Sequence, residues 1–147
     1  DEPTSVAIAA DGTIYVADSG NKRIRKLVKD AAGAWTAATL AGSGKTTFSP
    51  DDGPGTSATF ISPTGLAIDA AGRAYLGTAA GPVRRFEPAS GQVRLVAGAG
   101  APLLAGTGPD DALRDPRFLA LDPAGNLYIS DQVLKQVKRL TAAQLAF

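Results

Sequence analysis

The stretch that decides the fold is Pro3–Asp18, with the sequence PTSVAIAADGTIYVAD. It recurs as Pro63–Thr78, PTGLAIDAAGRAYLGT, and again as Pro116–Asp131, PRFLALDPAGNLYISD. The tyrosines of the chain all occupy one position of this unit, as Tyr15, Tyr75 and Tyr128. A unit that recurs in this way predicts a repeat architecture.

Each copy contains two short apolar runs separated by a turn. In the first copy Val6–Ile8 and Ile14–Val16 flank Asp11 and Gly12. β-Branched and aromatic runs of this length are typical of strands, and glycine provides the positive φ that a tight hairpin needs. Glycines stand at the same place in the other copies, as Gly72 and Gly125.

Further runs follow each copy. A third run carries two central basic residues, as Ile24–Leu27, Val83–Phe86 and Val137–Leu140. A fourth run follows only the first two copies, as Thr39–Gly44 and Leu95–Gly100. Residues in the first two runs are apolar at consecutive positions, which indicates that both faces of each small sheet are covered. A β-propeller covers both faces because every blade is sandwiched between two others.

We therefore expect an all-β fold, a β-propeller segment of three four-stranded antiparallel blades with the third incomplete. The whole chain 1–147 forms one segment, with blades at about residues 3–44, 63–100 and 116–147. Long loops are expected at 45–62 and 101–115. Small alanines in the first strands would allow the blades to converge: Ala7, Ala67 and Ala120.

The composition excludes several classes of site. Cysteine and histidine are absent, which removes disulfides, thiol nucleophiles, the commonest general base and the commonest zinc ligands. The net charge of +1 gives no global field that would attract nucleic acid, and no apolar run is long enough for a transmembrane helix. We expect no cofactor, no metal and no catalytic residues. The start at Asp1 rather than methionine suggests a processed or partial chain.

Two motifs that suggest ligand binding are better explained as loops. The stretch Gly42–Thr47, GSGKTT, resembles the end of a phosphate-binding loop, but Thr39 stands where that motif needs glycine, and prolines follow instead of a helix. The pairs Asp51-Asp52 and Asp110-Asp111 cannot complete a calcium shell by themselves and are typical of turn caps.

Charged side chains also recur from copy to copy. We interpret the paired basic residues of the third run as solvated residues of outer strands. Asp18 and Asp131, at the end of the second run, are expected to accept hydrogen bonds from the turn that follows.

The repeat resembles a known family. The stretch Asp18–Lys26, DSGNKRIRK, and the preceding pattern of proline, glycine and tyrosine are similar to the NHL repeat. Its linkers resemble the bacterial long-insert type, and each places an apolar residue three before the proline, Phe60 and Leu113. The second copy departs from the family at Thr78 and at its Gly81-Pro82 turn.

The resemblance implies a non-catalytic interaction or scaffold module of a bacterial extracytoplasmic or surface protein. Its partner-binding loops would contain Ser19, Asn21, Lys22, Arg23, Asp51, Asp52, Asp110 and Asp111. Three blades leave two apolar faces uncovered, so we expect half of a six-bladed ring. The partner is then another protein, a second copy that closes the ring, or the remaining blades of a longer chain. A lactonase-like or lyase-like propeller enzyme, with its catalytic residues in missing blades, and a self-assembling half-propeller stay open as alternatives.

Overall fold

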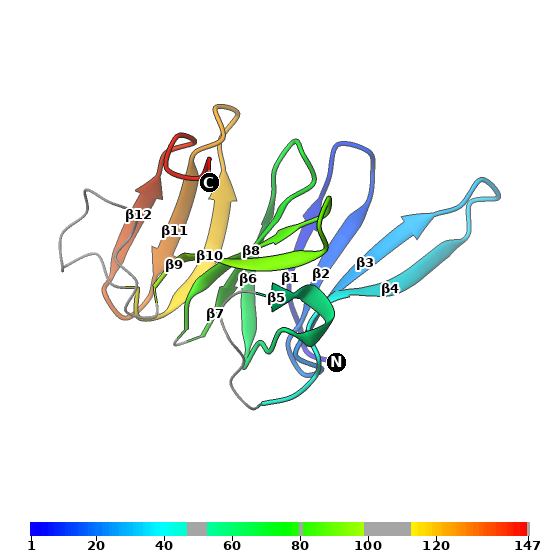
Figure 1. Cartoon of the computed structure of the whole chain (residues 1–147), viewed down its shortest axis with the longest axis horizontal. Coiled ribbons are helices and arrows are strands. Elements are labelled where there is room, and N and C mark those ends of the chain that lie inside the picture. Colours follow the sequence, from blue (N-terminus) through cyan, green and yellow to red (C-terminus); the bar gives the residue numbers. More distant parts are fainter. Residues whose placement is uncertain (47–52, 80, 99–112, 147) are drawn as a thin grey trace.

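The computed structural model describes residues 1–46, 53–79, 81–98 and 113–146. Over these residues the chain forms three antiparallel sheets that lie side by side (Figure 1). The first sheet, blade 1, contains β1 (Pro3–Ile8), β2 (Ile14–Asp18), β3 (Arg23–Lys29) and β4 (Trp35–Ala41) in that order. No helix in the described part of the chain is long and apolar enough to cross a membrane.

The second sheet has one strand more than a standard blade. Blade 2 contains β6 (Pro63–Ile68), β7 (Ala74–Thr78), β8 (Val83–Glu87) and β9 (Gln92–Ala97). The short strand β5 (Gly53–Pro54) pairs with the outer edge of β9, and the 3₁₀ turn η1 (Gly55–Ser57) follows it. The expected loop at 45–62 therefore contains a strand and a turn, because the linker runs back along the outer edge of the blade that it precedes.

The third sheet, blade 3, is incomplete as expected. It contains β10 (Pro116–Leu121), β11 (Leu127–Asp131) and β12 (Gln136–Leu140), and a series of turns follows over residues 142–145. The fourth strands of the other blades pair with their third strands, β4 with β3 and β9 with β8. In the described part of blade 3 the Leu145 side chain instead turns inward and is buried.

Strand register is the same in all three blades. The tyrosine of each second strand lies opposite the central alanine of the first strand: Ala7 with Tyr15, Ala67 with Tyr75, and Ala120 with Tyr128. The hairpin between these strands closes on the predicted glycine, since Gly12 has a φ of 82° and donates its N–H to the Ala9 carbonyl at 3.0 Å. The recurring sequence therefore forms the same pattern of backbone hydrogen bonds in each blade.

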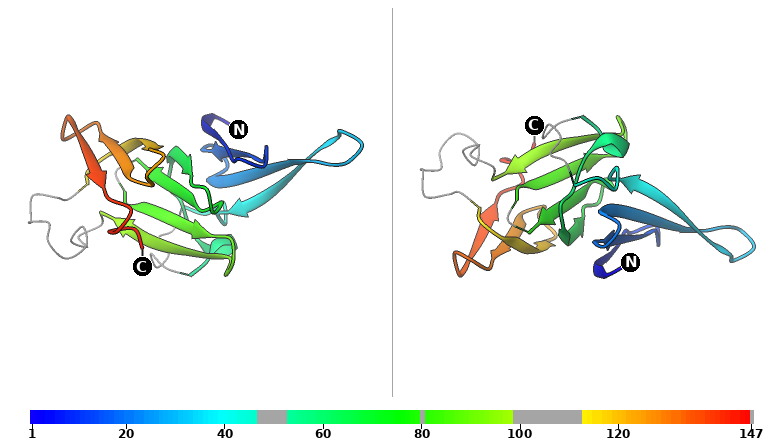
Figure 2. Two further views of the ribbon diagram at one scale, coloured as in Figure 1. Left: turned by 90° about the horizontal axis from the view of Figure 1, so that it is seen from above. Right: turned by 90° about the horizontal axis from the view of Figure 1, so that it is seen from below.

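The inner strands converge where the blades meet. Strand β6 packs against β1 on one side and β10 on the other, and the β3–β4 hairpin projects away from the rest of the chain (Figures 1 and 2). At the contact with blade 3, a Cβ placed on Gly77 would lie 2.4 Å from the Pro116 carbonyl oxygen. Only glycine allows this approach of two backbones.

Two cores fill the spaces between the blades. The core between blades 1 and 2 contains Tyr15, Ile24, Phe60, Leu76 and Phe86 with six further buried residues. The core between blades 2 and 3 includes these buried residues: Tyr75, Val83, Val96, Leu113, Leu127, Ile129 and Leu140. Blade 2 is thus covered on both faces, as its apolar pattern predicted.

The prediction of solvated basic pairs is wrong for blade 2. Arg84 and Arg85 are buried, at 3% and 1% exposure of the whole residue. Arg84 donates from Nη1 to the Thr59 carbonyl at 2.8 Å, and Arg85 donates to the Leu145 carbonyl and pairs with Glu87. Neighbouring residues of a strand point to opposite faces, so in a blade that is covered on both sides each arginine enters a different interface.

Candidate functional site

One face of blade 1 and one face of blade 3 are exposed, whereas both faces of blade 2 are buried. We call the uncovered face of blade 1 the leading face; its central side chains are Val6, Ile8, Val16, Arg25 and Leu27. We call the uncovered face of blade 3 the trailing face; its central side chains are Phe118, Ala120, Tyr128, Val137 and Arg139. Val6, Ile8, Phe118 and Val137 are all more than half exposed.

The same repeat positions are buried in blade 2. Val6 is 59% exposed, whereas Leu66, at the same position of β6, is 5% exposed. The difference arises from the neighbouring blade, because the strand pairing around these residues is identical. The leading and trailing faces therefore consist of the repeat positions that blade 2 buries against its neighbouring blades.

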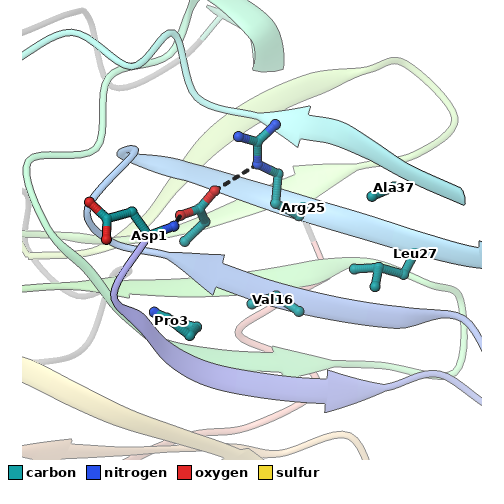
Figure 3. A pocket seen from close by; sticks show the side chains of 7 residues that line it. Asp1, Pro3, Val16, Arg25, Leu27 and Ala37 are labelled. Carbon is teal, nitrogen blue, oxygen red and sulfur yellow. Dashed lines mark hydrogen bonds and ion pairs between the residues drawn. The ribbon is translucent and has the colours of Figure 1, made fainter.

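A pocket of about 300 Å³ opens in the leading face (Figure 3). Pro3, Val16, Leu27 and Ala37 form its apolar walls, and they come from four different strands of blade 1. The pocket lies beside the ends of β1 and β2, where the first strand enters the blade. Its shape and chemistry suit an apolar group.

An ion pair between Asp18 and Arg25 forms the polar side of the pocket (Figure 3). Arg25 Nε donates to Asp18 Oδ2 at 2.7 Å, and Arg25 Nη1 donates to Thr39 Oγ1 at 2.7 Å. The Asp1 amino group donates to Asp18 Oδ1 at 2.7 Å. Burial alone would raise the pKa of Asp18, but the hydrogen bonds from Asp1, Arg25 and Asn21 hold the pKa of this carboxyl well below its usual range.

Asp131 occupies the position in blade 3 that Asp18 occupies in blade 1. Its carboxylate accepts the backbone N–H groups of Arg114 at 2.6 Å and of Leu134 at 3.0 Å. Burial would raise the pKa of Asp131, and these backbone hydrogen bonds lower it below its usual value. The prediction that Asp18 and Asp131 are acceptors for nearby turns is confirmed, and both carboxylates also fix the segment that leads into the blade.

The predicted partner-binding residues of the β2–β3 turn are placed at one end of blade 1. The Ser19 hydroxyl is buried and bonds to the Pro63 carbonyl, and Asn21 donates to Asp18 Oδ1 at 2.9 Å. Lys22 has a φ of 55° and its ammonium lies 3.4 Å from the Gly20 carbonyl. Arg23 packs beside Gly44. Ser19 and Asn21 thus hold the turn to its surroundings.

The remaining predicted residues, Asp51, Asp52, Asp110 and Asp111, lie outside the described residues. Sequence reasoning missed the pocket, because its lining residues come from four different strands and no local motif marks it.

Metal ligands do not cluster in the described part of the chain. Over residues 1–46, 53–79, 81–98 and 113–146, no three Asp or Glu side chains are close enough to hold an ion.

Comparison with known families identifies the repeat. The family model described as the NHL repeat matches residues 1–27. No curated protein matches the chain.

Solved structures match nearly the whole chain. A protein of unknown function from Bacteroides thetaiotaomicron superposes with a TM-score of 0.73 at 22% identity, over 92% of this chain and 34% of that one. An auxiliary nutrient binding protein from the same organism has a TM-score of 0.71 at 17% identity, over 91% and 36% of the two chains. A gluconolactonase from Xanthomonas campestris has a TM-score of 0.63 at 16% identity, over 97% and 44%.

These similarities concern the fold, and the chain spans between about a third and a half of the length of these structures. They include a binding protein as well as an enzyme, so they leave the activity open. The chain is a β-propeller segment of three consecutive blades, and its residues 1–27 match the NHL repeat.

Proposed function

We propose that this chain is a non-catalytic β-propeller module that serves as an interaction scaffold. Its binding surfaces are the leading and trailing faces, and its partner is a further set of blades of the same repeat type. The observation that supports this proposal is the exposure of repeat positions that blade 2 buries. Val137 is 71% exposed, whereas Val83, at the same position of β8, is fully buried.

Blade 2 indicates which surface complements each face. Its Leu66 and Leu76 pack toward blade 1, and its Tyr75 and Val83 pack toward blade 3. The leading face of one set of blades is therefore complementary to the trailing face of another set. Each aliphatic or aromatic side chain that is covered contributes about 1.5 to 3 kcal/mol relative to exposure.

A second copy of the chain provides both complementary faces. Two chains related by a two-fold axis would place each trailing face on the other chain's leading face, which makes two identical contacts and a six-bladed ring. Six blades lie within the range of four to eight at which propellers close.

Light scattering after size exclusion tests the proposal. The chain has a mass of 14.9 kDa. We expect a dimer of twice that mass for the wild type, and a monomer for the variant Val137→Glu. Val133→Glu is the matched control, because Val133 is 58% exposed in the turn between β11 and β12 and is not part of the trailing face. A folded wild-type chain that stays monomeric and binds no hydrophobic dye would overturn the proposal.

A second candidate is catalytic. The gluconolactonase from Xanthomonas campestris and a virginiamycin B lyase from Staphylococcus aureus share the fold with this chain at 16% and 15% identity. In that case the chain contributes one part of a propeller enzyme. Hydrolysis of a sugar lactone by this chain together with the further blades, but not by the further blades alone, would favour this candidate over the scaffold.

We also propose a bacterial extracytoplasmic location, on the alanine-rich composition and the long-insert style of the linkers. Fractionation of a bacterial cell that expresses the protein tests it.

A further inference from the structure

We draw no further inference here: the strongest candidate, the side-chain cluster of Asp69, Arg73, Tyr75, Arg85 and Glu87 at the hairpin end of blade 2, carries nothing because its two carboxylates pair with its two arginines and Arg85 also donates to the Leu145 carbonyl, so that nothing in the described part of the chain points to a ligand for it.

Discussion

Val83 and Val137 occupy the same position in the third strands of their blades, and the first is fully buried whereas the second is 71% exposed. The residue type, the strand and the neighbouring basic pair are alike, since Val83-Arg84-Arg85 corresponds to Val137-Lys138-Arg139. Only the presence of a following blade differs. The contribution of a repeat position to stability therefore depends on its place in the array, as in other stacked repeats.

Phe60→Ala is expected to destabilise the chain by about 3 to 5 kcal/mol, because it leaves a cavity between blades 1 and 2. Urea unfolding followed by circular dichroism measures the change. Ile61→Ala is the matched control: Ile61 is the next residue and is 59% exposed, so its truncation should cost less than about 0.5 kcal/mol. Phe60→Leu gives a milder test if the alanine variant does not fold. Equal losses for Phe60→Ala and Ile61→Ala would contradict the packing described.

Arg85→Ala should cost about 3 kcal/mol, because it leaves Glu87 without its ion pair and the Leu145 carbonyl without its donor. Arg139→Ala provides the comparison, since Arg139 has the same place in blade 3 but is exposed. We expect its effect to stay within about 0.5 kcal/mol when the unfolding of monomeric chain is measured. A ranking in which Arg139→Ala costs more than Arg85→Ala would show that blade 2 is not covered on both faces.

Gly42→Ala is expected to destabilise the chain by more than about 2 kcal/mol, for a steric and a conformational reason. Gly42 has a φ of 102°, and a Cβ at this position would lie 2.4 Å from the Lys22 carbonyl oxygen. Gly91→Ala separates the two reasons, because Gly91 has a φ of 68° but no atom within 4 Å of the added Cβ. Thermal unfolding of both variants should show the larger drop for Gly42→Ala, and similar drops would mean that the nearby Lys22 carbonyl does not restrict this position.

Stability is expected to fall as the solution becomes acidic. The pKa values of Asp18 and Asp131 are lowered in the folded chain, and an unfolded aspartate titrates near about 3.9. The unfolded chain therefore binds more protons below about pH 5, so the stability that these carboxylates contribute is complete above that pH and is lost as the pH falls.

Asp131→Asn tests this origin of the acid sensitivity. Urea midpoints measured from about pH 6 to pH 2 should decline less steeply in the variant than in the wild type, since one of the responsible carboxylates is gone. Part of the decline is expected to remain, because Asp11 and Asp122 also have lowered pKa values. An unchanged slope would mean that Asp131 titrates alike in the folded and unfolded chains.

Much of the fold was predictable from the sequence because it depends on local chemistry. The hairpin at Gly12, the alignment of Tyr15 with Ala7 and the carboxylate acceptors Asp18 and Asp131 all follow from residues close together in the chain. Such patterns recur three times, so one wrong assignment would have conflicted with the other two copies. The identity of the NHL repeat depends on the same local residues.

The sequence by itself determined the blades, their order and the strands of the recurring unit, although not the added strand β5, since turn chemistry and strand pairing act over short separations. Only the tertiary structure decided which faces are buried. It placed Arg84 and Arg85 in the interior, and it left Val16 and Leu27 around a pocket in the leading face. The physical reason is that burial is a property of two packed surfaces, and identical repeat units have different neighbours.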